Sequence, residues 1–208
     1  MAGLTGVLGG TFDPPHLGHR ILADEARFQL GLDRVLWVVT AQPPHKPEVP
    51  LSPAEIRAQM VDAAIGGDPH FELSRADLDR PGPHYSVDTL AWLSARHPQD
   101  RWAYLMGADS LRDLPKWHTP EALLEACEVL AVMGRPDVDV RLEELEARLP
   151  GLTGKLRWIA APLVDLASQE IRRRVAEGRP YRYWVPEGVA DLIGRYGLYS
   201  SHVRKRGD

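Results

Sequence analysis

The sequence predicts an α/β fold in which helices cover both faces of an open, parallel sheet. Six short apolar runs that are typical of buried strands alternate with longer amphipathic segments. Strands that alternate with helices indicate crossover connections, and such connections build parallel sheets. The 208 residues contain no internal repeat and no long linker. We therefore expect one domain over residues 1–199 and a flexible polar tail over residues 200–208.

The first half of the chain contains three of the predicted strands, at 4–8, 35–39 and 71–73. Apolar residues at helical spacing predict a helix that begins at Leu17 and ends at Gly31. The capping box Ser52-Pro53-Ala54-Glu55 predicts the start of a second helix, which Gly66-Gly67 ends. A third helix is predicted to begin at Tyr85-Ser86.

The second half contains the other three strands, at 102–106, 129–133 and 156–159. Its predicted helices begin at Thr119-Pro120-Glu121 and extend over 142–149, 168–177 and 186–195. Gly107 ends the strand at 102–106, so Asp109 lies beyond the carboxyl end of that strand. Because ligands of open parallel sheets bind at this edge, the position marks a candidate site.

Composition excludes several classes of function. The net charge of -4 and the isoelectric point near 6.1 argue against a nucleic-acid partner, which needs a broad basic surface. Cys127 is the single cysteine, which excludes an internal disulfide and a cysteine-rich zinc site. The sequence lacks a signal-peptide pattern and an apolar stretch of about 18 residues. We therefore expect a cytoplasmic protein without a membrane partner.

A glycine-rich turn, Gly9-Gly10-Thr11-Phe12-Asp13-Pro14-Pro15, joins the first strand to the first helix. Free backbone N–H groups and the positive helix end make such a junction suitable for phosphate. His16 and His19 follow at i and i+3, which places both imidazoles on one helix face. Gly18 between them leaves room for a flat ring or a phosphate oxygen. The turn therefore predicts a nucleotide site.

Two better-known phosphate motifs do not fit this chain. A Walker A loop ends in Gly-Lys, but Gly154-Lys155 has Leu149 where the first glycine is required. The glycines at 6, 9 and 10 do not match the dinucleotide pattern G-x-G-x-x-G either.

The string His16-Leu17-Gly18-His19 resembles the H-x-G-H signature of the nucleotidyltransferase superfamily, which implies a Rossmann-like nucleotidyltransferase fold. Further strings resemble bacterial nicotinate-nucleotide adenylyltransferases: Pro43-Pro44-His45-Lys46, Gly107-Ala108-Asp109-Ser110-Leu111 with Trp117, Arg135-Pro136, and Tyr196-Gly197-Leu198-Tyr199. The phosphopantetheine adenylyltransferase branch fits less well, because it usually has Thr in place of His16 and a shorter chain. The resemblance spans nearly the whole sequence.

This resemblance implies transfer of AMP from ATP to nicotinate mononucleotide, which gives deamido-NAD and pyrophosphate in NAD biosynthesis. The implied partners are ATP and nicotinate mononucleotide, with Mg²⁺ carried on the ATP phosphates. Self-association is left open. One alternative is the same reaction with a preference for nicotinamide mononucleotide. Another is a regulatory module that binds nucleotide without turnover.

The resemblance and the residue chemistry together predict the site residues. His16 and His19 are expected to donate hydrogen bonds to the α-phosphate, and Arg172 to bind phosphate oxygens. Neither histidine is assigned as a general base, because a 5′-phosphate is already ionised at neutral pH. The residues predicted to bind ATP or its phosphates are Gly9, Gly10, Thr11, Phe12, Gly18, Lys46, Gly107, Asp109, Arg135 and Ser168. Those predicted at the pyridine nucleotide are Asp13, His45, Tyr85, Ser86 and Trp117.

Several of these residues also admit structural roles. Thr11 suits a helix cap, Asp13 suits a turn before Pro14, and Asp109 suits a cap of the turn that follows it. Trp117 suits a core, and Lys46 on a proline-rich loop suits solvent. A three-histidine zinc site from His16, His19 and His45 is a further alternative, which the reaction class does not require.

The sequence departs from the family in one motif. The family pattern I-S-x-T-x-I-R corresponds to Leu166-Ala167-Ser168-Gln169-Glu170-Ile171-Arg172, so Ala167 and Gln169 replace a serine and a threonine. Two hydroxyl contacts to phosphate are therefore in doubt, and this motivates the regulatory-module alternative. Ser168 is still expected to cap the helix or to reach a phosphate.

Overall fold

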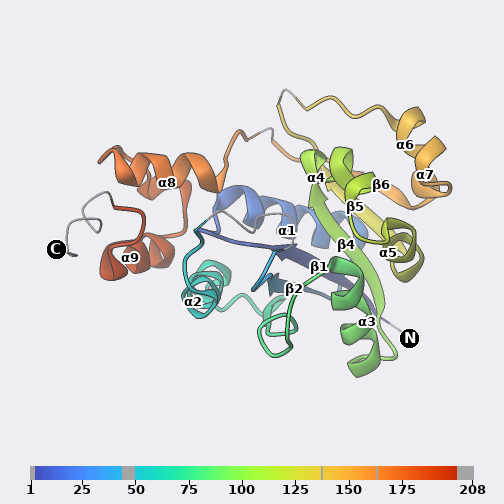
Figure 1. Ribbon diagram of the computed structural model, residues 1–208, viewed down its shortest axis with the longest axis horizontal. Helices are drawn as coiled ribbons and strands as arrows, with labels where there is room; N and C mark the ends of the chain where they lie inside the picture. Colours follow the sequence, from blue (N-terminus) through green and yellow to red (C-terminus); the bar gives the residue numbers. More distant parts are fainter. Residues whose placement is uncertain (1–2, 44–49, 137, 163, 201–208) are drawn as a thin grey trace.

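The computed structural model describes residues 3–43, 50–136, 138–162 and 164–200, and its centre is a six-stranded sheet (Figure 1). All neighbouring strands pair in parallel, in the order β3-β2-β1-β4-β5-β6, which confirms the predicted parallel α/β sheet. The strands are β1 (Leu4–Gly10), β2 (Arg34–Val39), β3 (Phe71–Ser74), β4 (Arg101–Gly107), β5 (Val129–Met133) and β6 (Leu156–Ile159).

All the predicted helices are present, with ends that differ by a few residues. They are α1 (Leu17–Leu30), α2 (Ala54–Ile65), α3 (Ser86–Arg96), α5 (Pro120–Ala126), α6 (Leu142–Arg148), α8 (Ser168–Ala176) and α9 (Glu187–Tyr196). Short elements that the sequence patterns did not indicate are α4 (Ala108–Asp113), η1 (Leu114–Lys116), α7 (Leu152–Lys155) and η2 (Arg182–Trp184). Within the described ranges, none of the helices combines the length and the hydropathy that a membrane span requires.

The predicted capping box of α2 is wrong. The N-cap of this helix is Pro53, which has no side-chain capping bond. Glu55 accepts a hydrogen bond from Arg75 at 2.8 Å, and the backbone N–H of Ser52 donates to Asp13 Oδ2 at 3.2 Å. Both groups of the expected box therefore have other partners, and these partners are charged, which makes the bonds stronger than a neutral cap.

The helices cover both faces of the sheet, as predicted, because side chains alternate along each strand. On β4, Tyr104 and Met106 lie in one core with Leu90 of α3 and Leu123 of α5, among others. Leu105 lies in the opposite core, which includes residues of α1 and α2. The sheet is thus buried on both sides, as parallel sheets are.

A third core holds the C-terminal helices against α2. Met60 and Ala64 of α2 pack with Ile171 of α8 and with Val189 and Ile193 of α9. The opposite side of α2 packs on the sheet. Figure 1 shows α8 and α9 lying together at one end of the molecule. Through α2, the sheet thereby determines where α8 lies.

The carboxyl ends of the central strands meet at one edge. β1 and β4 are neighbours although three helices and two strands separate them in sequence, so the connections diverge between them. Open α/β sheets bind ligands at such a switch point. The segments that leave this edge after β1, β4 and β5 contain the predicted residues His16, Asp109 and Arg135.

Candidate active site

The two histidines lie at the start of α1, with His16 as the N-cap and His19 in the first turn. Their rings stack with centroids 3.7 Å apart and planes at 29°, which confirms that they share one face. The backbone N–H of His16 donates to His19 Nδ1 at 3.1 Å. Neutral His19 therefore has its proton on Nε2, where it is available as a hydrogen-bond donor.

Both imidazoles are neutral at pH 7. Burial lowers the pKa of His16 from 6.5 to about 4, and the positive charge of Arg135 contributes. Burial also lowers the pKa of His19 well below its ordinary value, with further contributions from His16 and Arg135. The two rings therefore provide N–H donors, and Arg135 provides the fixed positive charge.

Gly18 is required by His16 itself. A Cβ at residue 18 would lie 3.1 Å from His16 Nδ1, which is tighter than ordinary packing. The room that we expected for a ligand beside Gly18 is thus partly filled by the His16 ring. His16 Nδ1 is buried and faces the backbone N–H of His19 in the capping box of α1, without a hydrogen bond of good geometry within the described part of the chain.

The loop after β1 rests on a packed aromatic base. Phe12 has a positive φ of 48° and is 1% exposed, so its side chain points into the protein. Its ring centroid lies 5.0 Å from His19 and 5.4 Å from Trp37. A Cβ at Gly10 would lie 3.1 Å from the Phe12 ring, so the backbone there approaches the ring closely. The Phe12 ring packs against the His19 ring and is buried. The predicted contact of Phe12 with a phosphate can therefore be made only by its backbone.

Arg57 was missed by the sequence reasoning, although it organises this loop. Arg57 lies on α2, and its side chain is buried. The guanidinium donates hydrogen bonds of 2.8–3.0 Å to four carbonyl oxygens, those of Thr11, Thr40, Ala41 and Ser52. A signal was present, because Arg57 lies three and four residues before Met60 and Val61, on the apolar face of the helix. An arginine at such a position indicates a buried structural cation.

Helix α8 binds the next part of the loop. Ser168 Oγ donates to the carbonyl oxygen of Pro14 at 2.8 Å, and Arg172 Nη1 donates to that of Asp13 at 2.7 Å. The structure thus brings both predicted residues to the loop after β1 that leads to His16, which we call the histidine loop. Capping by Ser168 was the wrong alternative, because the N-cap is Ala167 and has no side-chain capping bond. With Arg57, these contacts pair the carbonyls of the loop, which reduces their repulsion of an anion.

Asp13 is fully buried in the same loop. Its carboxylate accepts hydrogen bonds from the Ser52 N–H at 3.2 Å and from the Tyr199 hydroxyl at 2.5 Å. The predicted contact of Asp13 with the pyridine nucleotide stays a prediction. Thr11 lies beside it, partly exposed, and no capping bond from Thr11 to α1 is made, because His16 is the N-cap.

Arg135 links the other side of the site. Its guanidinium lies 3.4 Å from Asp109 Oδ2 and donates to the carbonyl oxygen of Leu166 at 3.1 Å, just before α8. A Cβ at Gly107 would lie 2.6 Å from Asp109 Oδ1, so this glycine permits the sharp turn from β4 into α4. The predicted Gly107, Asp109 and Arg135 therefore lie together, and the charge of Arg135 acts on both histidines.

The residues predicted for the pyridine ring lie around the start of α3. Tyr85 is its N-cap, and Ser86 Oγ accepts a hydrogen bond from the buried Tyr104 hydroxyl at 2.8 Å. Trp117 lies edge-on to Tyr104, with ring centroids 6.2 Å apart, and packs partly against the core. His118, which the sequence reasoning missed, stacks on Tyr85 at 4.1 Å.

His45 and Lys46 lie outside the described residues, so their predicted roles stay predictions. The start of their loop is fixed by His84, another residue that the sequence reasoning missed. His84 is 4% exposed, and its Nδ1 accepts a hydrogen bond from the backbone N–H of Gln42 at 3.1 Å. The segment that leads to Lys46 is thereby tied to the segment that precedes Tyr85.

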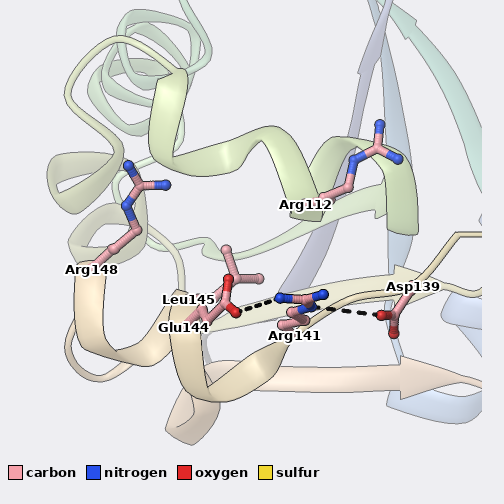
Figure 2. Close-up of a pocket in the computed structure, with 6 residues that line it drawn as sticks. All are labelled: Arg112, Asp139, Arg141, Glu144, Leu145 and Arg148. Atoms are coloured by element: carbon pink, nitrogen blue, oxygen red, sulfur yellow. Dashed lines mark hydrogen bonds and ion pairs between the residues drawn. The ribbon is translucent and has the colours of Figure 1, made fainter.

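A separate hollow of about 250 Å³ lies between α4 and α6 (Figure 2). Three arginines line it, but Arg141 pairs with Glu144 at 2.9 Å and with Asp139 at 3.9 Å. None of the predicted site residues lines this hollow. We therefore place the candidate site at the histidine loop and not here.

No group of three or more His, Cys, Asp or Glu side chains that could hold a metal ion gathers within the described ranges. The three-histidine zinc alternative includes His45, which lies outside those ranges. Asp109 supplies the carboxylate among the predicted ATP-binding residues. It lies beside Arg135, and its side chain is 44% exposed.

Comparisons with known proteins identify the family of this chain. The cytidylyltransferase-like family matches residues 7–174. A Thermomicrobium roseum protein named "Probable nicotinate-nucleotide adenylyltransferase" is 44% identical over 194 residues, which are 93% of this chain and 90% of the relative. A Thermus thermophilus protein of the same name is 46% identical over 194 residues, which are 93% of this chain and 98% of that protein. This chain belongs to the nicotinate-nucleotide adenylyltransferase family.

Solved structures of more distant proteins share the fold of this family. Plasmodium falciparum nicotinic acid mononucleotide adenylyltransferase complexed with NaAD superposes with a TM-score of 0.78, at 19% identity, over 95% of this chain and 97% of that one. The same enzyme complexed with APC gives a TM-score of 0.76 at 18% identity. At this level of identity the likeness confirms the predicted nucleotidyltransferase fold.

Proposed function

We propose that this protein transfers AMP from ATP to nicotinate mononucleotide, which gives deamido-NAD and pyrophosphate in NAD biosynthesis. The observation that carries the proposal is the pair of stacked, neutral imidazoles at the start of α1. It is supported by relatives named nicotinate-nucleotide adenylyltransferase at 44–46% identity. Because the reaction uses ATP, we propose the cytoplasm as its compartment.

In this reaction a 5′-phosphate oxygen of nicotinate mononucleotide attacks the α-phosphorus of ATP. The bond from that phosphorus to the bridging oxygen of the β-phosphate breaks, and pyrophosphate takes the electron pair. The attacking phosphate is already ionised, so no side chain needs to remove a proton. The protein contributes position and charge stabilisation, which dominate catalysis of phosphoryl-type transfers.

The residues of the site divide this work. His16 and His19 donate N–H groups to oxygens of the α-phosphate, where negative charge rearranges in the transition state. Arg135 and Arg172 supply positive charge, and Arg172 retains free guanidinium donors after its bond to Asp13. The backbone of Gly9 to Phe12 and the start of α1 receive phosphate oxygens.

Mg²⁺ fits this site as a companion of ATP. Magnesium usually keeps several waters and binds through substrate phosphates with one or two carboxylates, and Asp109 is the exposed carboxylate available for this. When bound, the ion neutralises charge on the triphosphate.

The start of α3 favours nicotinate over nicotinamide. The first N–H groups of a helix and its dipole stabilise a carboxylate more than a neutral amide, and the N-cap Tyr85 places them beside Trp117 and His118. The flat face of Trp117 suits the pyridine ring.

One assay tests the activity and its substrate. Pyrophosphate release from ATP is measured with nicotinate mononucleotide, with nicotinamide mononucleotide and with neither. We expect release that depends on the mononucleotide, with the higher kcat/KM for nicotinate mononucleotide. A higher kcat/KM for nicotinamide mononucleotide would contradict the substrate assignment, and ATP binding without release would instead support the regulatory module.

A further inference from the structure

The carboxylate of Asp13 is a buried charge with partners from two distant parts of the chain. Ser52 lies before α2, and Tyr199 lies beyond the end of α9, 186 residues after Asp13. An ionised carboxylate in a protein interior is stable only when it is hydrogen-bonded or paired. The Tyr199 hydroxyl is therefore one of the groups on which this part of the loop depends.

Tyr199 reaches Asp13 by an unfavourable backbone conformation. Gly197 ends α9 with φ 58°, a conformation that glycine adopts readily. Tyr199 itself has φ 63°, a left-handed conformation that residues with a side chain rarely adopt. Such a conformation persists where the surrounding contacts determine it, often near a functional site. Burial and the neighbouring Asp13 raise the pKa of Tyr199, so its hydroxyl keeps the proton that it donates.

The bond acts on the segment that leads into the histidine pair. The backbone carbonyl of Asp13 accepts from Arg172, and that of Pro14 accepts from Ser168. Tyr199 and α8 therefore bind the same residue: Tyr199 contacts the side chain of Asp13, and α8 contacts its backbone carbonyl. His16 follows Asp13 by three residues, so a shift of Asp13 is transmitted directly to the first imidazole.

We propose that Tyr199 is a positioning residue for adenylyl transfer, which holds the segment 13–16 through Asp13 so that His16 and His19 meet the α-phosphate. The proposal rests on the proposed function and makes the C-terminal turn a part of the support of the site. Tyr199 touches no reacting atom in this account. Its effect is on the placement of the rings.

The test compares Tyr199→Phe with Tyr196→Phe. Tyr196 is a matched control, because its hydroxyl also links the C-terminal segment to α2, at 2.8 Å to Gln59, but away from the loop. Hydrogen–deuterium exchange of the segment 11–16 is measured first. We expect about tenfold faster exchange in Tyr199→Phe, which corresponds to the loss of one buried hydrogen bond, and no change in Tyr196→Phe.

Steady-state kinetics then separate positioning from mere stability. Ring placement matters more in the transition state than in the ground state, so we expect kcat to fall about tenfold in Tyr199→Phe while the KM for ATP stays within about threefold. Tyr196→Phe is expected to match the wild type in both. The double variant Tyr199→Phe, Asp13→Asn should lose less than the product of the single effects, because one interaction is removed in both.

The other outcomes test the role of Tyr199 and the proposed adenylyl transfer separately. Unchanged exchange in Tyr199→Phe, or faster exchange with unchanged kcat, overturns the proposal. If the wild type releases no pyrophosphate, the proposed function fails, and unchanged loop exchange still overturns the role of Tyr199. Melting temperatures check folding. If Tyr199→Phe does not fold, Asp13→Asn takes its place, with faster loop exchange expected and unchanged exchange contradicting the proposal.

Discussion

His19 is the residue whose donor role the geometry defines most closely. The bond from the His16 N–H to its Nδ1 leaves Nε2 as the donor, and Phe12 packs edge-on against its ring. We therefore expect His19→Ala to lower kcat about 100- to 1000-fold, the usual effect of removing one such donor, with little change in ATP affinity. Steady-state kinetics with nucleotide-binding measurements check this. A variant with unchanged turnover would contradict the assigned role.

The buried imidazole of His16 predicts a pH dependence of stability. Its pKa is about 4 in the folded protein and near 6.5 when unfolded, so the unfolded chain binds the proton first as pH falls. We expect this contribution to be complete above about pH 6.5 and to be lost as pH falls toward 4. The free energy of unfolding should depend less steeply on pH in His16→Asn over this interval. An imidazole titration midpoint near 6.5 by NMR would contradict the prediction.

At the scale of elements, α2 is more than a layer of the sheet, because Arg57 ties it to the loop after β1. Its guanidinium is 1% exposed and has four carbonyl partners. Burial lowers its pKa, while the negative charge of Asp13 opposes that shift. Loss of the guanidinium would remove a hydrogen-bond donor from each of these carbonyl oxygens at once, which is costly.

Arg57→Met tests this link between α2 and the loop. The substitution removes the guanidinium donor from four partly buried carbonyls, so we expect the free energy of unfolding to fall by about 3 kcal/mol or more. Arg112→Met is the control, because the Arg112 side chain is 51% exposed and, among the residues that the structure describes, pairs with Asp113 alone, at 3.4 Å. We expect a change within about 0.5 kcal/mol. Denaturant unfolding measures both. Equal effects of the two substitutions would show that Arg57 has no special role.

The sequence predicted element types better than the contacts at element ends. Strands and helices follow from apolar periodicity, which is a local property, and Gly31 and Gly66 end α1 and α2 with left-handed φ as expected. Thr119 is the N-cap of α5 and Pro120 is its first residue, as predicted, but Thr119 is left-handed and makes no side-chain capping bond. Competing partners decide such caps, and those partners are distant in sequence.

At the scale of the whole molecule, three cores are connected by two elements that they share, the sheet and α2. The sheet separates the first two cores, and α2 contributes to both the second and the third. We therefore propose that residues 1–199 unfold as one unit, as the sequence analysis expects. Calorimetry should show a single transition at neutral pH. A separate, earlier transition of the C-terminal helices would contradict this.

The site was predicted where motifs are contiguous and missed where the fold alone brings residues together. His16, His19, Ser168 and Arg172 were identified from strings in the sequence, and the structure brings them to one loop. Arg57 carries no motif, and the string that contains Tyr199 does not predict its bond to Asp13, because both contacts depend on the packing of α2 and of the C-terminal turn. His84 also carries no motif, and it binds Gln42 at the start of a different loop, the one after β2.

The central claim is that the two stacked imidazoles hold the reacting phosphate of ATP. A crystal structure of the protein with a non-hydrolysable ATP analogue tests it most directly. We expect an α-phosphate oxygen within about 3 Å of His19 Nε2, and a second hydrogen bond from the His16 ring. A triphosphate bound away from both rings would contradict the account.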